Sequence, residues 1–226
     1  IYNIKMKIFV IGYNKCASST MHNIFVHNGY KSYHQGCQYK IRKWTDVLDS
    51  YDVFLDIAPD INLIDKLHKK YKDSLYILNT RPLNKWLISR AEHGVRGYIK
   101  NGKHAFFPLS EKLITSWTNS RNNHNMDILK YFMDTPDKLI VLNIDNKNWI
   151  DFLTNKLKLK NKNIESKNIH NSSKYNNEIK ELIKQTFNKL KYKKEQMEAL
   201  ISSNNFNTYY YIKLYINNLN NDRLLT

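Results

Sequence analysis

The chain is poor in glycine, proline and cysteine: of its 226 residues, 6 are Gly, 4 are Pro and 2 are Cys. So little Gly and Pro excludes collagen-like and low-complexity proteins. The two cysteines, Cys16 and Cys37, cannot form a disulfide framework or a C-x-x-C metal pair. The cysteine content therefore favours a reducing compartment or indifference to redox state.

Long hydrophobic runs are also missing. No window approaches the roughly 20 uninterrupted apolar residues that cross a bilayer, which argues against a membrane-spanning protein. The first ten residues, IYNIKMKIFV, are apolar over too short a stretch for a signal peptide and lack a cleavage site of small residues. We therefore expect a cytoplasmic or other intracellular soluble protein. The chain begins at Ile1, which leaves the true N-terminus open.

Acidic residues are scarce beside basic ones. The chain has 36 Lys and Arg against 20 Asp and Glu, a formal net charge of +16. Residues 156–194 carry much of this excess, with twelve Lys and three Glu. Such a balance favours an anionic partner: a nucleotide, a sulfated or phosphorylated substrate, a membrane surface or nucleic acid. The charge does not choose among them, and a codon bias toward Lys and Asn explains it equally well.

Short β-rich runs alternate with helical patterns over the first two-thirds of the chain, which is typical of an α/β fold with a mainly parallel sheet. Residues 7–12, KIFVIG, form a nearly continuous apolar run ending in glycine, so we predict a central strand buried on both faces. The other predicted strands are residues 30–34, 53–57, 75–80 and 139–144. Helices are predicted between them, including residues 83–93 and 149–157, and residues 155–177 are polar enough for a loop or flap.

The pattern changes near residue 176. Apolar residues between positions 179 and 201 fall on one stripe at helical spacing, which predicts a long amphipathic helix. We therefore expect residues 1–175 to form the α/β domain and residues 176–226 to form a helical C-terminal extension packed on it. The lysines of the extension fit a solvent-exposed face better than a nucleic-acid or membrane patch.

The first candidate site follows the predicted central strand, where residues 13–22 read YNKCASSTMH. A strand, a turn of small residues and a helix N-terminus form an anion site, because free backbone N–H groups converge there and the helix dipole adds to them. Ser18, Ser19 and Thr20 add hydroxyl donors, and Lys15 adds a positive charge. The run differs from G-x-x-x-x-G-K-[ST] because Lys15 precedes the small residues. The structural alternative is a Ser-Ser-Thr helix cap.

The second candidate site is formed by Arg81 and Ser89. An arginine at the carboxyl end of a parallel strand faces the ligand crevice, and a serine about two helical turns later can reach the same anion. The structural alternative is an arginine paired with a surface acid, beside an ordinary helix serine.

Together the two sites resemble those of the sulfotransferase family that uses 3′-phosphoadenosine 5′-phosphosulfate (PAPS), most strongly its small microbial and viral members. The loop of that family usually reads Lys-Ser/Thr-Gly-Thr-Thr, and here residues 15–20 read KCASST. Cys16 replaces the usual Ser/Thr, and Ala17 replaces the commonest glycine. The Arg and Ser that hold the 3′-phosphate in the family stand eight residues apart, as Arg81 and Ser89 do.

This resemblance covers roughly residues 7–175 and implies transfer of a sulfuryl group from PAPS to an acceptor hydroxyl or amine, with a P-loop-type fold and no metal. It implies that Lys15 stabilises the leaving phosphate oxygen and that residues 16–20 hold the 5′-phosphate. It further implies that Arg81 and Ser89 hold the 3′-phosphate.

The acceptor must lose a proton, which calls for a general base. Our first candidate is His34, at the end of the second predicted strand, because the resemblance places a catalytic histidine in this region in some glycan sulfotransferases. The second candidate is Asp56, at the end of the run VFLDI. The acceptor stays open: an anionic glycan, a small alcohol, a phenol and a peptide tyrosine fit equally.

Two other functions are left open. One is a P-loop kinase of a nucleotide or small metabolite with Asp56 as its Mg²⁺ ligand, although the position of Lys15 and the missing second loop glycine count against it. The other is a basic nucleic-acid-binding protein without catalysis, which would use the charge of residues 156–194. We consider nucleic acid the less favoured partner.

Overall fold

The computed structural model describes residues 6–34, 44–57, 59–100 and 109–160, together with Glu181 and Gln185. Within them, parallel strands form a 5-stranded sheet in the order β2-β3-β1-β4-β5. The strands are β1 (Ile8–Val10), β2 (Ser32–His34), β3 (Val53–Leu55), β4 (Leu75–Thr80) and β5 (Leu139–Asn143). Each lies within its predicted segment, and the α/β fold with a central β1 is confirmed.

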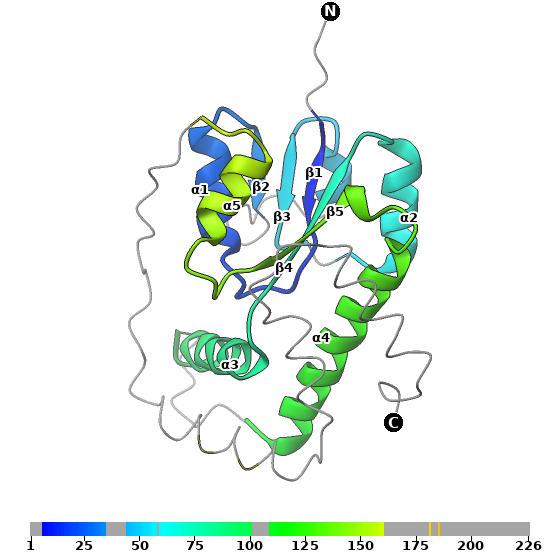
Figure 1. Cartoon of the computed structure of the whole chain (residues 1–226). Coiled ribbons are helices and arrows are strands. Elements are labelled where there is room, and N and C mark those ends of the chain that lie inside the picture. Colours follow the sequence, from blue (N-terminus) through cyan, green and yellow to red (C-terminus); the bar gives the residue numbers. More distant parts are fainter. Residues whose placement is uncertain are drawn as a thin grey trace, which may run out of the picture.

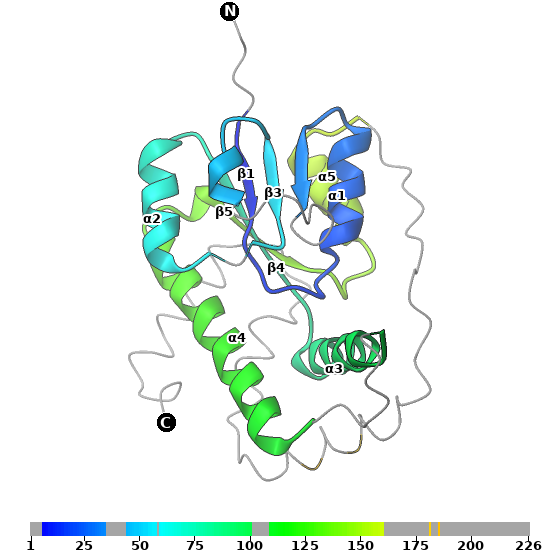
Figure 2. The same cartoon turned by 180° about the vertical axis from the view of Figure 1, so that it is seen from behind.

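Helices cover both faces of the sheet (Figure 1, and from behind in Figure 2). They are α1 (Ser18–His27) and α5 (Trp149–Lys156) on one face, and α2 (Ile61–Lys70) and part of α4 (Glu111–Tyr131) on the other. Side chains alternate along β1, so Ile8 and Val10 pack toward α1 and α5. Phe9 packs on the opposite face, toward α2 and α4. The apolar run of β1 is continuous because both faces are covered.

A third apolar cluster lies beyond the carboxyl ends of the strands. It joins α3 (Leu83–Lys100) to the N-terminal part of α4 and includes Trp86, Ile114 and Cys16. Figure 1 shows α3 below the sheet and α4 running from below the sheet up along its side. Because Cys16 belongs to the loop after β1, this cluster binds that loop to the two helices. Two short 3-10 helices, η1 (Trp44–Val47) and η2 (Pro136–Lys138), complete the described elements.

The predicted C-terminal extension, residues 176–226, lies outside the described residues apart from Glu181 and Gln185, which are helical. Most of the predicted flap at residues 155–177 lies outside them as well. Among the helices that the structure describes, none has both the length and the apolar character that crossing a membrane requires.

Candidate functional site

The loop that leaves β1 has an unusual backbone where it enters α1. Lys15 and Ala17 have φ angles of 66° and 60°, in the left-handed region. A residue other than glycine costs roughly 1–2 kcal/mol in this region. Such a conformation persists only where surrounding contacts hold the backbone in place. The contacts of this loop therefore show how its left-handed residues are held.

Strand β4 holds both ends of the loop through one side chain. Asn79 accepts a hydrogen bond from the backbone N–H of Gly12 at 3.0 Å and donates one from Nδ2 to the Cys16 carbonyl at 2.7 Å. The Asn79 side chain is buried. A buried polar side chain is seldom left without partners, and here the two ends of the loop satisfy it.

Helix α3 holds the middle of the loop. Trp86 Nε1 donates to the Asn14 carbonyl at 2.9 Å, and Arg90 Nη1 donates to Asn14 Oδ1 at 2.8 Å. The Arg90 guanidinium carbon lies 5.5 Å from the centre of the Trp86 ring and 4.7 Å from that of Trp117, within cation–π range of both. The guanidinium is therefore fixed by rings as well as by its hydrogen bond.

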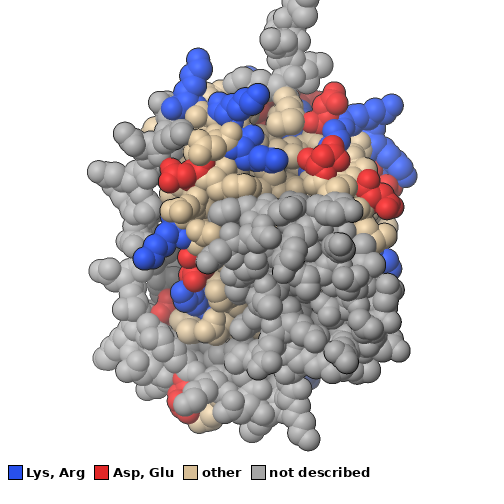
Figure 3. All heavy atoms as spheres, in the orientation of Figure 1, with Lys and Arg blue, Asp and Glu red and all other residues tan. Residues whose placement is uncertain are grey.

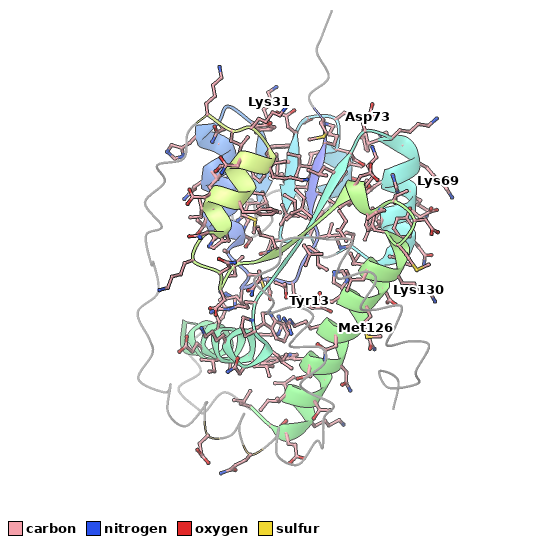
Figure 4. The ribbon with its side chains drawn as sticks, viewed as in Figure 1. Tyr13, Lys31, Lys69, Asp73, Met126 and Lys130 are labelled. Carbon is pink, nitrogen blue, oxygen red and sulfur yellow. The ribbon has the colours of Figure 1, made fainter. Side chains whose placement is uncertain are left out.

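Tyr13 and His124 complete the support from below the strand ends. In Figure 4, Tyr13 lies between the sheet and helices α3 and α4. Its ring meets those of Trp86 and His124 edge-on, with centroids 5.8 and 5.2 Å apart. His124 Nε2 lies 2.7 Å from the Ile11 carbonyl and must donate to it, because a carbonyl only accepts. His124 thus supports the start of the loop.

The Ser-Ser-Thr run does not cap α1 in the way the structural alternative supposed. Ala17 is the N-cap residue, and no side chain caps the helix from that position. The Ser18 hydroxyl instead lies 3.1 Å from His34 Nε2. Ser19 is exposed and Thr20 is half-buried. The first N–H groups of a helix have no acceptor within the helix, so this end of α1 offers donors to an anion.

Arg81 lies directly after β4, and its Nη1 donates to the Lys15 carbonyl at 3.3 Å. Its Nε is buried without a hydrogen-bond partner in the described structure. Arg121 of α4 is buried, donates to the Thr80 hydroxyl at 2.9 Å and also bonds the Arg81 carbonyl. The predicted arginine is therefore brought against the predicted loop, and Arg121 fixes its backbone.

Ser89 is half-buried on α3, about two turns beyond Arg81. No hydrogen bond joins the described Ser89 and Arg81 side chains. The structure thus brings Arg81 to the loop but does not link it to its predicted partner.

The two base candidates lie next to each other, because β2 and β3 are parallel neighbours and both end at the loop edge of the sheet. His34 Nε2 lies 4.0 Å from Asp56 Oδ2, and the histidine side chain is only 6% exposed. Burial lowers the pKa of His34, so its imidazole is neutral at pH 7.

Asp56 has a left-handed φ of 63°. Burial raises the pKa of its carboxyl, against the opposite pull of Lys15, His93 and Arg90. Its Oδ1 is buried without a hydrogen-bond partner in the described structure.

Cys16 is not a nucleophile. Its thiol is buried, and burial raises its pKa to about 11, so it stays protonated at neutral pH. Cys16 contributes its carbonyl to the Asn79 bond and its side chain to the cluster with α3. Its place in the loop is a packing position, which explains how a small apolar side chain replaces the usual Ser/Thr.

Sequence reasoning missed the residues that support the loop from outside it. They are Asn79, Trp86, Arg90 and Arg121. Asn79 left one signal, a polar side chain inside the apolar run of residues 75–80. The others sit on helices where a tryptophan or arginine has many ordinary uses, and only the tertiary structure shows their contacts.

Charge on the described surface is mixed. On the face shown in Figure 3, basic and acidic side chains are interspersed in the part that the structure describes. The Lys-rich residues 156–194 lie mostly outside that part, so the nucleic-acid alternative stays a prediction. Within the described ranges, no three His, Cys, Asp or Glu side chains gather as a metal-binding group.

Comparison with known proteins gives one family. A profile of sulfotransferase domains matches residues 7–185 of the chain. The match contains both predicted sites and continues past residue 175, where the sequence predicts the end of the α/β domain. No curated protein and no solved structure matches the chain.

Proposed function

Since the chain belongs to the sulfotransferase domain family, as its loop and arginine predicted, we propose that it transfers a sulfuryl group from PAPS to an acceptor hydroxyl. The family makes the protein a transferase, while the donor and the residue roles are our proposal. One observation carries the proposal. The Arg81 guanidinium donates to the Lys15 carbonyl, three residues before the start of α1 at Ser18, which has no side-chain cap.

The described residues fit a donor with two phosphate groups. At one end of the site, α1 offers backbone N–H groups and the hydroxyls of Ser19 and Thr20, and the helix dipole favours a negative charge there, while the Ser18 hydroxyl is shared with His34 Nε2. At the other, Arg81 has a buried Nε without a partner. A charged donor buried in this way is costly unless a ligand meets it. We assign the 5′-phosphate to α1 and the 3′-phosphate to Arg81, with Ser89 as its helper.

When bound, PAPS supplies the sulfuryl group and a phosphate as the leaving group. The sulfur–oxygen bond to that phosphate breaks while a bond to the acceptor oxygen forms, so negative charge grows on the leaving oxygen. Lys15 is the proposed residue that offsets this charge. The tight support of the loop suits such a role, because electrostatic catalysis needs charges that are already in position. The proposal needs no metal.

The acceptor proton goes to His34 in this proposal. A neutral imidazole can take a proton, and the Asp56 carboxylate 4.0 Å away favours the imidazolium that results. His34 Nε2 also contacts the Ser18 hydroxyl, so the base and the anion-binding helix share a hydrogen bond. Asp56 remains the second candidate for the base.

A binding experiment in EDTA tests the proposed donor. We expect 3′,5′-adenosine bisphosphate to raise the melting temperature without magnesium, whereas a P-loop kinase would need Mg²⁺ to bind its nucleotide tightly. Arg81→Ala should weaken bisphosphate binding about tenfold or more, because a buried charged hydrogen bond is lost. Isothermal titration calorimetry measures the affinity.

Lys85→Ala is the matched control. Lys85 also lies near the start of α3, but it is exposed and pairs with Asp145 at 2.8 Å. Its loss should leave bisphosphate affinity unchanged. No stabilisation of the wild-type protein by the bisphosphate in EDTA would refute the proposed donor.

A further inference from the structure

The buried side chain of Asn79 on β4 holds a position that the catalytic proposal does not use. The backbone N–H of Ile11 still pairs with the Ile77 carbonyl at 2.9 Å, as in a parallel ladder. The next N–H, that of Gly12, is taken by Asn79 Oδ1 at 3.0 Å. Regular alternation would direct the Gly12 N–H toward β3, as it does the N–H of Ile8, so the chain leaves the sheet at Gly12, where the β4 side chain of Asn79 takes this N–H.

The same amide closes the loop at its other end. Asn79 Nδ2 donates to the Cys16 carbonyl at 2.7 Å, one residue before the N-cap of α1. A carboxamide carries an acceptor and donors on one rigid plane, so one side chain serves both ends. The distance between the end of β1 and the start of α1 is thereby set by β4.

Gly12 shows how close this approach is. A Cβ atom at Gly12 would lie 2.0 Å from the Asn79 carbonyl oxygen and 2.4 Å from its Oδ1. The first of these atoms is backbone and cannot give way. Glycine at position 12 is therefore required by contact with Asn79.

Arg81 follows directly after β4, two residues beyond Asn79. Its guanidinium donates to the Lys15 carbonyl of the loop at 3.3 Å. One short stretch of β4 thus fixes the loop and presents the arginine beside it.

We propose that Asn79 is a positioning residue for the donor site. Asn79 ties the loop between β1 and α1 to β4, and so sets the distance between α1 and Arg81. This inference rests on the proposed function, because it assigns the start of α1 and Arg81 to the two phosphates of one donor. Asn79 itself touches no reacting atom.

The test compares Asn79→Ala with Asn143→Ala. Asn143 is a matched control because it is buried and ends the neighbouring strand β5, in register with Thr80, but bonds the N–H of Asp145 instead of the loop. We expect Asn79→Ala to weaken 3′,5′-adenosine bisphosphate binding at least tenfold at a temperature where it stays folded. Asn143→Ala should change affinity less than twofold, whatever its melting temperature.

An acid rescue separates positioning from general destabilisation. In Asn79→Asp, a carboxylate accepts from Gly12 but faces the Cys16 carbonyl, which also only accepts. Once that new carboxylate is protonated, its O–H regains a donor for the Cys16 carbonyl. Bisphosphate affinity of Asn79→Asp, relative to wild type at the same pH, should therefore recover as pH falls from 8 to 5.5.

Hydrogen exchange keeps the inference testable if the proposed donor is wrong. Peptides covering residues 11–20 should exchange at least tenfold faster in Asn79→Ala than in Asn143→Ala, with or without a nucleotide. Failure of wild-type binding would refute the donor and leave this result standing. Unchanged loop exchange in Asn79→Ala would overturn the positioning role, as would unchanged affinity in a wild-type protein that does bind.

Discussion

Helices α1 and α2 each follow a parallel strand, β1 and β3, but their N-termini differ. At α2, the Asp60 side chain accepts from the N–H of Leu63 at 2.8 Å, and Ser110 does the same for Leu113 at α4. At α1, the N-cap is Ala17 in a left-handed conformation, without a side-chain cap. The fold thus forgoes at α1 a stabilising contact that it makes at two other helices.

A missing side-chain cap alone does not mark a ligand site, because α5 also begins without one at Asn148; at α1 it is combined with a left-handed backbone at Lys15 and Ala17. A side-chain cap is worth about 1 kcal/mol to a helix. Its omission at α1 coincides with a loop held by Asn79, Trp86 and Arg90, whose hydrogen bonds fix the strained backbone.

The strongest test of this contrast removes the cation that precedes α1. Lys15→Ala should lower the rate of sulfuryl transfer by about 10²–10³-fold or more, because the developing charge on the leaving oxygen loses its stabilising group. Bisphosphate affinity should fall only modestly. The rate is measured under single-turnover conditions with labelled PAPS, and a rate like that of wild type would contradict the role of Lys15.

A second test adds a negative charge at the start of α1. Ala17→Asp places a carboxylate at the N-cap of α1, where it repels an anion. We expect bisphosphate affinity to fall by about 10-fold or more, with no loss of thermal stability, since Asp tolerates the left-handed region better than Ala.

The mirror experiment is Asp60→Ala at α2. It should cost about 1 kcal/mol of unfolding free energy and leave bisphosphate affinity unchanged. If Ala17→Asp and Asp60→Ala changed bisphosphate affinity equally, the starts of α1 and α2 would not differ in anion binding.

The smallest expected effect is on the pH dependence of stability. Burial lowers the pKa of His34 and of His22, whose rings lie 5.6 Å apart. The unfolded chain therefore takes up protons before the folded one, and the free energy of unfolding should decrease as pH falls below about 6.5. His34→Gln should flatten this decrease by at most about 1.4 kcal/mol per pH unit.

One control sharpens that measurement, which uses urea unfolding between pH 7.5 and 5.5. The raised pKa of Asp56 acts in the opposite direction, so the comparison is repeated in an Asp56→Asn background. A slope that His34→Gln leaves unchanged in both backgrounds would show that His34 does not carry it.

The sheet and the centre of the site were predictable because their signals are local. Continuous apolar runs mark strands covered on both faces, and the carboxyl ends of parallel strands meet at one edge. This rule brings His34 and Asp56 together without any knowledge of the helices. The same edge receives Lys15 and Arg81, which the structure joins through the loop backbone.

Helix α4 was not predicted, because it changes partners along its length. Its C-terminal part packs on the sheet through Ile128 and Phe132, while Ile114 packs against α3. Between them it buries polar side chains, among them Arg121 and Asn125. A single apolar stripe is therefore absent, and with it the main sequence signal of a helix.

The buried thiol in the loop has a practical consequence for chemistry in solution. Burial raises the pKa of the Cys16 thiol to about 11, so the thiol stays protonated at pH 7, and alkylating reagents attack the thiolate. Iodoacetamide should thus spare the folded protein at this position and label it when the loop opens. Alkylation of Cys16 therefore reports opening of the loop.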